Sequence, residues 1–256
     1  MISSLATAFR MQLHLALRTP NYWMTQLTTP LQVIIFLSVV DTFDRPDLIT
    51  HALLAPILIT MWSTTLWTGG SVVRDDRWAG RLEMHVAAPL SYGWVVAVRV
   101  AAVVLLALLV VPITLGTAVL TYGVDIEVQH PWLLAVTVGV TMLAIVGTGV
   151  VFSSMTILMR GAVSFQNSAS YPFLLLGGVF VPLSLLPLWA QPLGRLVFLS
   201  WSSDLIRDSV GEATVTNVGG RMAALVGLGA IGLFAGQRLV GAILNRVRIS
   251  GEISTS

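Results

Sequence analysis

The chain of 256 residues has no cysteine, and all of its basic residues are arginine, with no lysine among them. The absence of cysteine excludes disulfides, thiolate metal sites and cysteine nucleophiles. A Walker A motif requires a lysine, so the chain cannot bind ATP by that route. If this protein uses ATP to do work, another subunit must supply the ATP site.

Charge is also scarce, because 10% of the residues are charged, whereas a soluble domain has about 25%. The sequence is 55% hydrophobic, with a mean hydropathy of +0.85. At this length it predicts one integral membrane domain covering residues 1–256. The pI is near 9.5, but the arginines are scattered at the ends of apolar segments and form no dense stripe. We therefore expect no nucleic-acid partner.

Six apolar segments meet the requirement of about 20 residues for crossing a bilayer as a helix. The first is the least apolar, because Thr28, Thr29, Pro30 and Gln32 interrupt it. The fourth and sixth are rich in glycine, which predicts close helix packing rather than ligand binding. The fold class is therefore an all-α integral membrane protein with six transmembrane helices. The predicted spans are residues 22–40, 48–73, 95–121, 132–159, 168–186 and 222–244.

The arginines predict the orientation of the bundle. An even number of spans places both termini on one side, and that side holds ten of the 14 arginines. By the positive-inside rule, this side is cytoplasmic. We expect a multi-pass protein of the plasma (inner) membrane with both termini in the cytoplasm. Arginine without lysine, together with many Ala, Val, Leu and Gly residues, is typical of a bacterial genome rich in GC.

A charged segment separates the second and third spans, at residues 74–91. Its arginines recur at helical spacing, which predicts a short polar helix on the cytoplasmic side. Such a helix is a place where a membrane protein would contact a soluble partner. The alternative is an ordinary solvated loop. The candidate contact residues are Arg74, Asp75, Asp76, Arg77, Arg81 and Glu83.

Residues 3–19 are predicted to form a basic amphipathic helix before the first span. Arg10, His14 and Arg18 are four positions apart and share one helical face, while apolar residues spread over the opposite side. Such a helix lies in the membrane interface. The alternative is a short charged leader that contacts lipid alone. The charges also argue against a cleaved signal sequence.

The region after the fifth span carries three prolines in apolar sequence, Pro182, Pro187 and Pro192. A continuous helix cannot hold all three without breaks. We expect residues 188–210 to form two short helices that re-enter the outer leaflet without crossing it and cap the outer end of the bundle. Trp189 and Trp201 would then lie at the outer interface, where indole is favoured. The alternative is a plain outer loop.

Uncharged polar residues in the second span and at the start of the fifth are candidates for lining a pathway. Intramembrane polar groups often mark such pathways, although Ser and Thr can also bond their own helix backbone. A pathway with so little charge would suit hydrophobic or amphipathic cargo. The candidate residues are Thr60, Ser63, Thr64, Gln166, Asn167 and Ser170.

Taken together, the chain resembles the permease subunit of type-2 ABC exporters. The resemblance rests on the N-terminal interfacial helix, on the cytoplasmic segment and on the proline-rich stretch before the outer helices. In the cytoplasmic segment the matching residues are Arg74, Gly80, Leu82, Glu83, Pro89, Leu90 and Ser91. In the proline-rich stretch they are Gly178, Val179, Phe180, Pro182, Leu186, Pro187 and Trp189.

The resemblance implies that two permeases, identical or related, pair around a central pathway in the lipid bilayer. Two ABC ATPase subunits would dock on them through residues 74–83 and would bind ATP and Mg. This chain would hold no cofactor or metal and would not itself be an enzyme. The implied activity is efflux of a drug-like or antibiotic-like substrate. The alternative is export of a polysaccharide or lipid by the same type of complex.

Other classes of function find less support in the residues. A membrane enzyme needs clustered polar residues at membrane depth, but His14, His51, His85 and His130 are dispersed near the ends of the spans. A secondary transporter usually carries paired charges within its spans, and the span centres lack them, since Arg99 lies near the inner end of its helix. A structural membrane subunit within a larger machine remains a further alternative.

Overall fold

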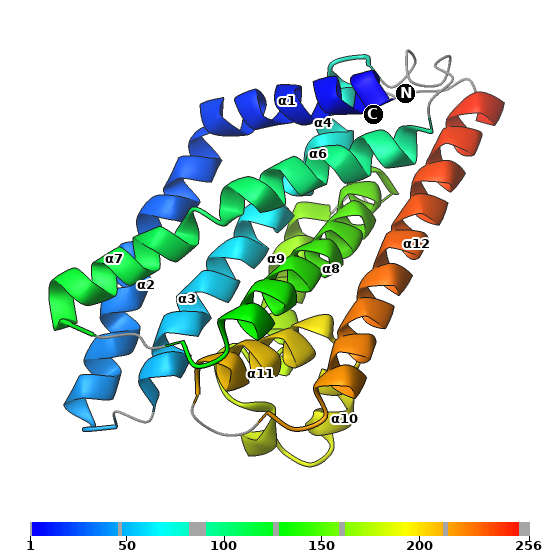
Figure 1. Ribbon diagram of the computed structural model, residues 1–256. Coiled ribbons are helices and arrows are strands. Elements are labelled where there is room, and N and C mark those ends of the chain that lie inside the picture. Colours follow the sequence, from blue (N-terminus) through cyan, green and yellow to red (C-terminus); the bar gives the residue numbers. More distant parts are fainter. Residues whose placement is uncertain are drawn as a thin grey trace.

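The computed structural model describes residues 2–45, 48–81, 91–124, 128–158, 162–211 and 215–250. Within these ranges the chain forms helices and connecting turns, with no β-strand. Figure 1 shows a bundle with α1 (Ile2–Arg18) across one end and α10 (Ala190–Arg195) and α11 (Phe198–Val210) at the other. We call these the α1 end and the α11 end. The predicted all-α class is confirmed.

The remaining elements run between these two ends. They are α2 (Pro20–Thr42), α3 (Ile49–Thr64), the π-helical η2 (Thr65–Gly69), α4 (Val72–Trp78), α6 (Tyr92–Ala107), α7 (Val110–Tyr122), α8 (Pro131–Leu158), α9 (Ala162–Leu176), the 3-10 helix η3 (Leu183–Leu185) and α12 (Val218–Ser250).

Five helical segments of the described chain are long and apolar enough to cross a membrane, where the sequence predicted six. They are Pro20–Thr42, Ile49–Trp78, Tyr92–Tyr122, Pro131–Thr156 and Val218–Asn245. The predicted span 168–186 differs from the structure, because its helix α9 covers Ala162–Leu176. Gly178, with a φ of +66°, lies in the turn where the helix has ended. With 15 residues, α9 is about 22 Å long.

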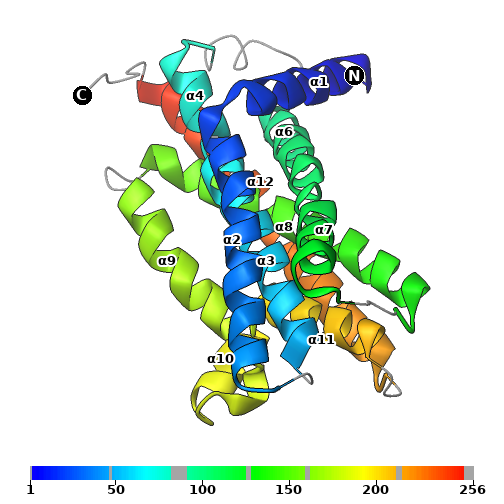
Figure 2. The ribbon, with the colours of Figure 1, turned by 90° about the vertical axis from the view of Figure 1, so that its left-hand side faces the viewer.

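The joint between α1 and α2 turns the chain from the end of the bundle into its long axis. Thr19 has an extended conformation, and Pro20 occupies the first turn of α2, where a missing N–H costs nothing. Figure 2 shows α1 lying across the bundle and α2 running down it. Packing of α1 against α6 fixes this arrangement.

The predicted third span is not one straight helix. It consists of α6 and α7, separated at Leu108 and Leu109. Pro112 lies in the first turn of α7 and has no N–H to donate to the carbonyl of Leu108, so the helical ladder is interrupted there. Beyond this break, α7 packs against α2 and α3, whereas α6 packs against α1 and α8.

The core is built around α8, which packs against α12, α11 and α6. Gly147 and Gly229 allow α8 and α12 to approach closely. A Cβ atom at Gly147 would lie 2.6 Å from the carbonyl oxygen of Gly229, and a Cβ at Gly229 would lie 2.9 Å from Ala144. The interpretation of these two glycines as packing residues is therefore confirmed.

Candidate functional site

At the α1 end, the charged segment after the second span is anchored in the protein interior by Asp76. The α4 positions Val72, Val73 and Asp76 are buried, and the Asp76 side chain has no exposed surface. Its Oδ2 atom lies 2.5 Å from Nη1 of Arg99, a side chain of α6 that is 2% exposed. This is a buried ion pair between the charged segment and the third span.

Further side chains complete the surroundings of this pair. Tyr92 donates its hydroxyl hydrogen to Asp76 Oδ2 at 2.9 Å, and Arg81 Nε lies 3.2 Å from Asp76 Oδ1. On the other side, Arg99 Nε donates to Gln12 Oε1 of α1 at 2.8 Å. We call Gln12, Asp76, Arg81, Tyr92 and Arg99 the Asp76 cluster. It joins α1, α4 and α6 at a single point.

The energetics of a buried ion pair indicate how strongly this junction resists separation. Burying both charges costs most of what their attraction returns, so the pair itself adds little net stability. Removing one partner is different, because it leaves the other charge buried without compensation, at about 3–5 kcal/mol. Separation of α4 from α6 would leave Asp76 and Arg99 in that state. The two helices are therefore expected to move as one body.

The other predicted contact residues that the structure describes lie at or near the surface. Arg74 and Asp75 are partly exposed, with 3.9 Å between Arg74 Nε and Asp75 Oδ1, and Arg77 is half-buried. Glu83 lies outside the described residues. The sequence grouped Asp76 with these residues as a candidate contact, and in the structure its side chain is buried against Arg99.

Sequence reasoning did not include Trp78 among the contact residues. It ends α4 and is 83% exposed. Gly80, with a φ of +64°, then turns the chain away. An exposed tryptophan flanked by charges is typical of the residues that dominate protein–protein interfaces. The signal was in the sequence, because a large aromatic residue interrupts an otherwise polar segment.

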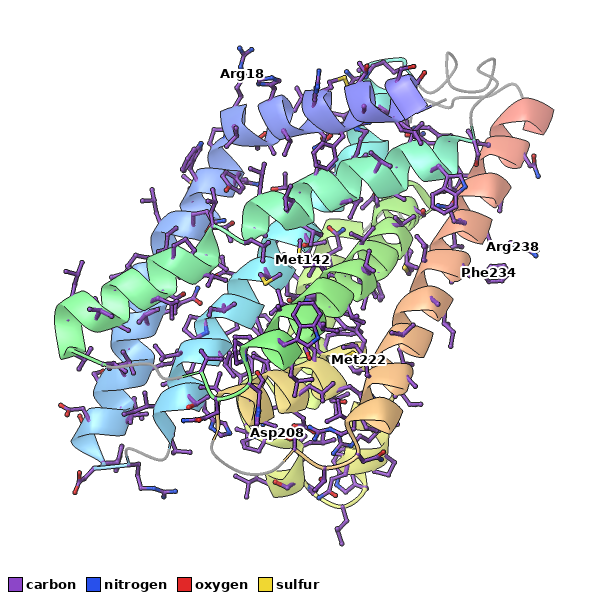
Figure 3. The ribbon with its side chains drawn as sticks, in the orientation of Figure 1. Arg18, Met142, Asp208, Met222, Phe234 and Arg238 are labelled. Atoms are coloured by element: carbon purple, nitrogen blue, oxygen red, sulfur yellow. The ribbon has the colours of Figure 1, made fainter. Side chains whose placement is uncertain are left out.

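The helix α1 presents its predicted face to the outside. Arg10, His14 and Arg18 are all exposed, and Arg18 points away from the bundle (Figure 3). Gln12, on the other side of the helix, is the residue that reaches Arg99. The charged face is therefore available to a partner or to lipid headgroups while the opposite side is fixed.

The six candidate pathway residues do not form a single row. Thr60 is buried against α2, where its hydroxyl lies 3.0 Å from that of Thr29. Gln166 and Ser170 of α9 face η2 and α3, and Ser170 Oγ accepts a hydrogen bond from Trp62 at 3.1 Å. Thr64 is buried, Ser63 is half-buried and Asn167 is exposed.

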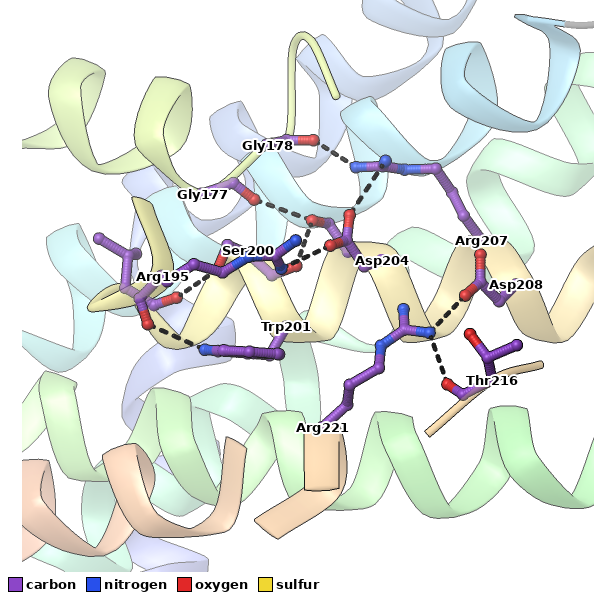
Figure 4. A network of polar contacts seen from close by, with 12 residues as sticks. Gly177, Gly178, Arg195, Ser200, Trp201, Asp204, Arg207, Asp208, Thr216 and Arg221 are labelled. Carbon is purple, nitrogen blue, oxygen red and sulfur yellow. Dashed lines mark hydrogen bonds and ion pairs between the residues drawn. The ribbon is translucent and has the colours of Figure 1, made fainter. Parts of the chain in front are cut away.

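At the α11 end, the predicted pair of short helices is present as α10 and α11. A second polar cluster holds them together (Figure 4). Asp204 Oδ2 lies 2.7 Å from Arg195 Nη1, and Asp204 Oδ1 lies 3.4 Å from Arg207 Nη1. Arg207 also donates to the carbonyl of Gly178, which ties α11 to the end of α9. We call Arg195, Asp204 and Arg207 the Asp204 cluster.

Two further contacts extend from this cluster. Asp208 pairs with Arg221 at 2.6 Å and so connects α11 to the start of α12. Burial lowers the pKa of the Arg207 guanidinium, and the carboxylates of Asp204 and Asp208 oppose that shift. Of the predicted cap residues, Pro187, Trp189 and Pro192 are exposed and Pro182 precedes η3.

The described ranges hold no group of three or more His, Asp or Glu side chains arranged to bind a metal ion. The site is instead a helical membrane bundle with a charged segment anchored at one end and two short helices at the other. This architecture is that of a multi-pass membrane protein. The family described as ABC-2 type transporter matches residues 4–210, and the chain belongs to it as a permease. No curated protein matches the chain.

Proposed function

We propose that this chain is the membrane subunit of an ATP-driven exporter of hydrophobic or amphipathic, drug-like molecules. In this proposal, two ABC ATPase subunits bind ATP and Mg, and two permeases form the pathway. The family supports the division of labour, since its permeases normally partner an ABC ATPase. The sequence supports it as well, because a chain without lysine has no Walker A motif.

The observation that carries the proposal is the two-sided construction of α4. Its outer side presents Trp78 and the partly exposed charges of Arg74 and Asp75. Its inner side holds Asp76 in the buried pair with Arg99. A partner that moves α4 would pull on α6 directly, because the pair cannot separate without a large cost. The ATPase would thus act on the third span as well as on the second.

We further propose six crossings, with α9 as the short one. The helix α8 runs from the α11 end to the α1 end, and α12 covers that distance again, so the chain must return in between. Figure 2 shows α9 running along the bundle towards α10. With six crossings, both termini lie on the side rich in arginine, which the positive-inside rule makes cytoplasmic.

The experiment that tests the function uses Trp78→Ala in the permease, co-expressed with its ATPase. We expect loss of co-purification or of substrate-stimulated ATP hydrolysis, since interface tryptophans often contribute 2 kcal/mol or more, or roughly 30-fold in affinity. The matched control is Trp132→Ala, because Trp132 is 80% exposed at the α11 end. Normal coupling in the Trp78 variant, or equal loss in both, would contradict docking through α4.

A further inference from the structure

An apolar groove lies between α3, α7, α8 and α11, with a volume of about 260 Å³. Its walls include Leu53 and Ile57 of α3, Leu115 of α7 and Val138 of α8. Two threonines, Thr50 and Thr141, also line it. The hydroxyl of Thr141 donates to the carbonyl of Thr137 at 2.7 Å and lies 2.6 Å from that of Ser202. The Thr141 hydroxyl therefore already has hydrogen-bond partners within the protein, and the groove is mainly apolar.

The break at Pro112 is the physical origin of this groove. Just before it, hydrogen bonds that span three residues replace the α-helical bonds that span four. The amide of Leu108 donates to the carbonyl of Leu105 at 3.2 Å, and the amide of Leu109 donates to the carbonyl of Leu106 at 3.1 Å. After the break, α7 leans towards α2 and α3, whereas α8 follows α11 and α12 (Figure 1). The space left between α7 and α8 is lined from both sides.

The length of the groove indicates what it can hold. It follows α3 from Ile49, at the α11 end, to Met61 in the middle of the second span. Twelve helical steps correspond to about 18 Å, which is about half of a hydrocarbon core that is roughly 30 Å thick. The groove thus extends over one leaflet and ends near the middle of the bilayer.

The volume agrees with this dimension. A dry apolar cavity of about 150 Å³ is enough to bind benzene, and the groove is larger and elongated. Within a leaflet, the apolar molecules of this length that are always available are acyl chains. A groove lined mainly by aliphatic side chains gains most from a hydrocarbon chain, because a polar ligand group would find few hydrogen-bond partners there.

We propose that the groove binds one acyl chain of a phospholipid from the leaflet at the α11 end. The headgroup lies beside Ile49 and Val128, and the chain terminus lies between Met61 and Leu108. The site is a lipid site within a single permease and is independent of the ATPase and of the exported substrate. Failure of the export proposal would leave it standing.

The test is photo-crosslinking of the purified permease reconstituted with phosphatidylglycerol that carries a diazirine on one acyl chain. Two probes are compared, one with the diazirine near the carbonyl and one with it at the chain terminus. Peptide mapping should place the terminal label on the α3 and α7 segments near Met61 and Leu108. The other label should appear near Ile49 and Val128.

Two pairs of variants distinguish a bound chain from ordinary bilayer contact. Val138→Trp and Leu115→Trp fill the groove from opposite walls and should remove most of the labelling there. Leu143→Trp and Leu120→Trp place the same side chain on the same helices at positions that are 70% and 87% exposed, and should leave it unchanged. Thermal unfolding of each variant verifies the fold, and the two walls provide independent replicates.

Three outcomes would overturn the proposal. The first is labelling spread evenly over the exposed apolar residues of the bundle. The second is groove labelling that both filling variants retain. The third is a terminal label found near Ile49, which would reverse the direction of the chain. Depth-ordered labelling that both fillings remove, with both controls unaffected, supports it.

Discussion

The two polar clusters of this permease are each centred on an aspartate paired with arginines, but they differ in burial and in the helices that they connect. In the Asp76 cluster, the paired side chains of Asp76 and Arg99 are 0% and 2% exposed. In the Asp204 cluster, the side chains of Asp204 and Arg195 are 18% and 42% exposed. Water can therefore replace a lost partner at the α11 end and cannot do so at the α1 end.

The clusters also differ in how far along the chain they reach. Arg99 binds Gln12, which is 87 positions away, and thereby connects the third span to the first helix. Arg195 and Asp204 are separated by nine positions and belong to adjacent short helices. We infer that the Asp76 cluster sets the arrangement of whole helices, whereas the Asp204 cluster stabilises the local fold of α10 and α11.

The largest effect is expected for Asp76→Leu, which leaves Arg99 buried without a counter-charge. The free energy of unfolding should fall by about 3–5 kcal/mol. The double variant Asp76→Leu, Arg99→Leu should lose less, because apolar residues can replace a buried ion pair at little cost. Reversible unfolding of the purified permease in detergent provides the measurement. Asp75→Leu is the control, since Asp75 is the exposed neighbour. An equal effect of the two single variants would show that burial of Asp76 does not determine its contribution to stability.

The sequence predicted features that depend on neighbouring residues better than features that depend on contacts between distant segments. The apolar runs predicted segments that coincide with all five candidate spans, with ends that differ by one to five residues, because a span must be apolar over its whole length. The same runs say nothing about rotation around a helix axis. Val72 and Asp76 are four positions apart and share a face, and that was the available sign that Asp76 points inward.

Other features depended on pairings that no local pattern contains. A charged residue within an apolar helix requires a partner, but the sequence analysis treated Arg99 only as a residue near the inner end of its helix, and no local pattern identifies Asp76 and Gln12 as its partners. The early end of α9, by contrast, has a local cause. Apolar residues continue to Leu186, but the helix ends at Leu176, where Gly178 adopts a φ of +66° and the amide of Val179 bonds back to the carbonyl of Leu174. Arg207 of α11 then binds the carbonyl of Gly178.

An intermediate effect is expected for Gln12→Leu, which removes the acceptor of Arg99 Nε and leaves Asp76 in place. A hydrogen bond to a charged group contributes about 1.5–3 kcal/mol, so the loss should lie below that of Asp76→Leu. Hydrogen exchange should increase in α1 more than in α4, because α1 alone loses its polar contact with α6. His14→Leu, on the exposed face of α1, should change neither quantity. Equal protection of α1 in both variants would show that apolar packing is sufficient to hold this helix.

The smallest effect is expected for Arg195→Ala at the α11 end. An exposed ion pair contributes about 0–1 kcal/mol, and the contact of the Arg195 guanidinium with the Trp201 ring, at 4.6 Å, adds a comparable amount.

Raising the salt concentration shortens the Debye length from about 10 Å at 0.1 M to about 3 Å at 1 M. The ion-pair part of the Arg195 effect should therefore shrink with salt, whereas the deficit of Asp76→Leu should stay constant, since ions do not reach a buried pair. Unfolding both variants across this salt range measures the difference in burial between the two clusters directly. A deficit of Arg195→Ala that is as large as that of Asp76→Leu, and as insensitive to salt, would mean that α10 and α11 are held by a buried core of their own.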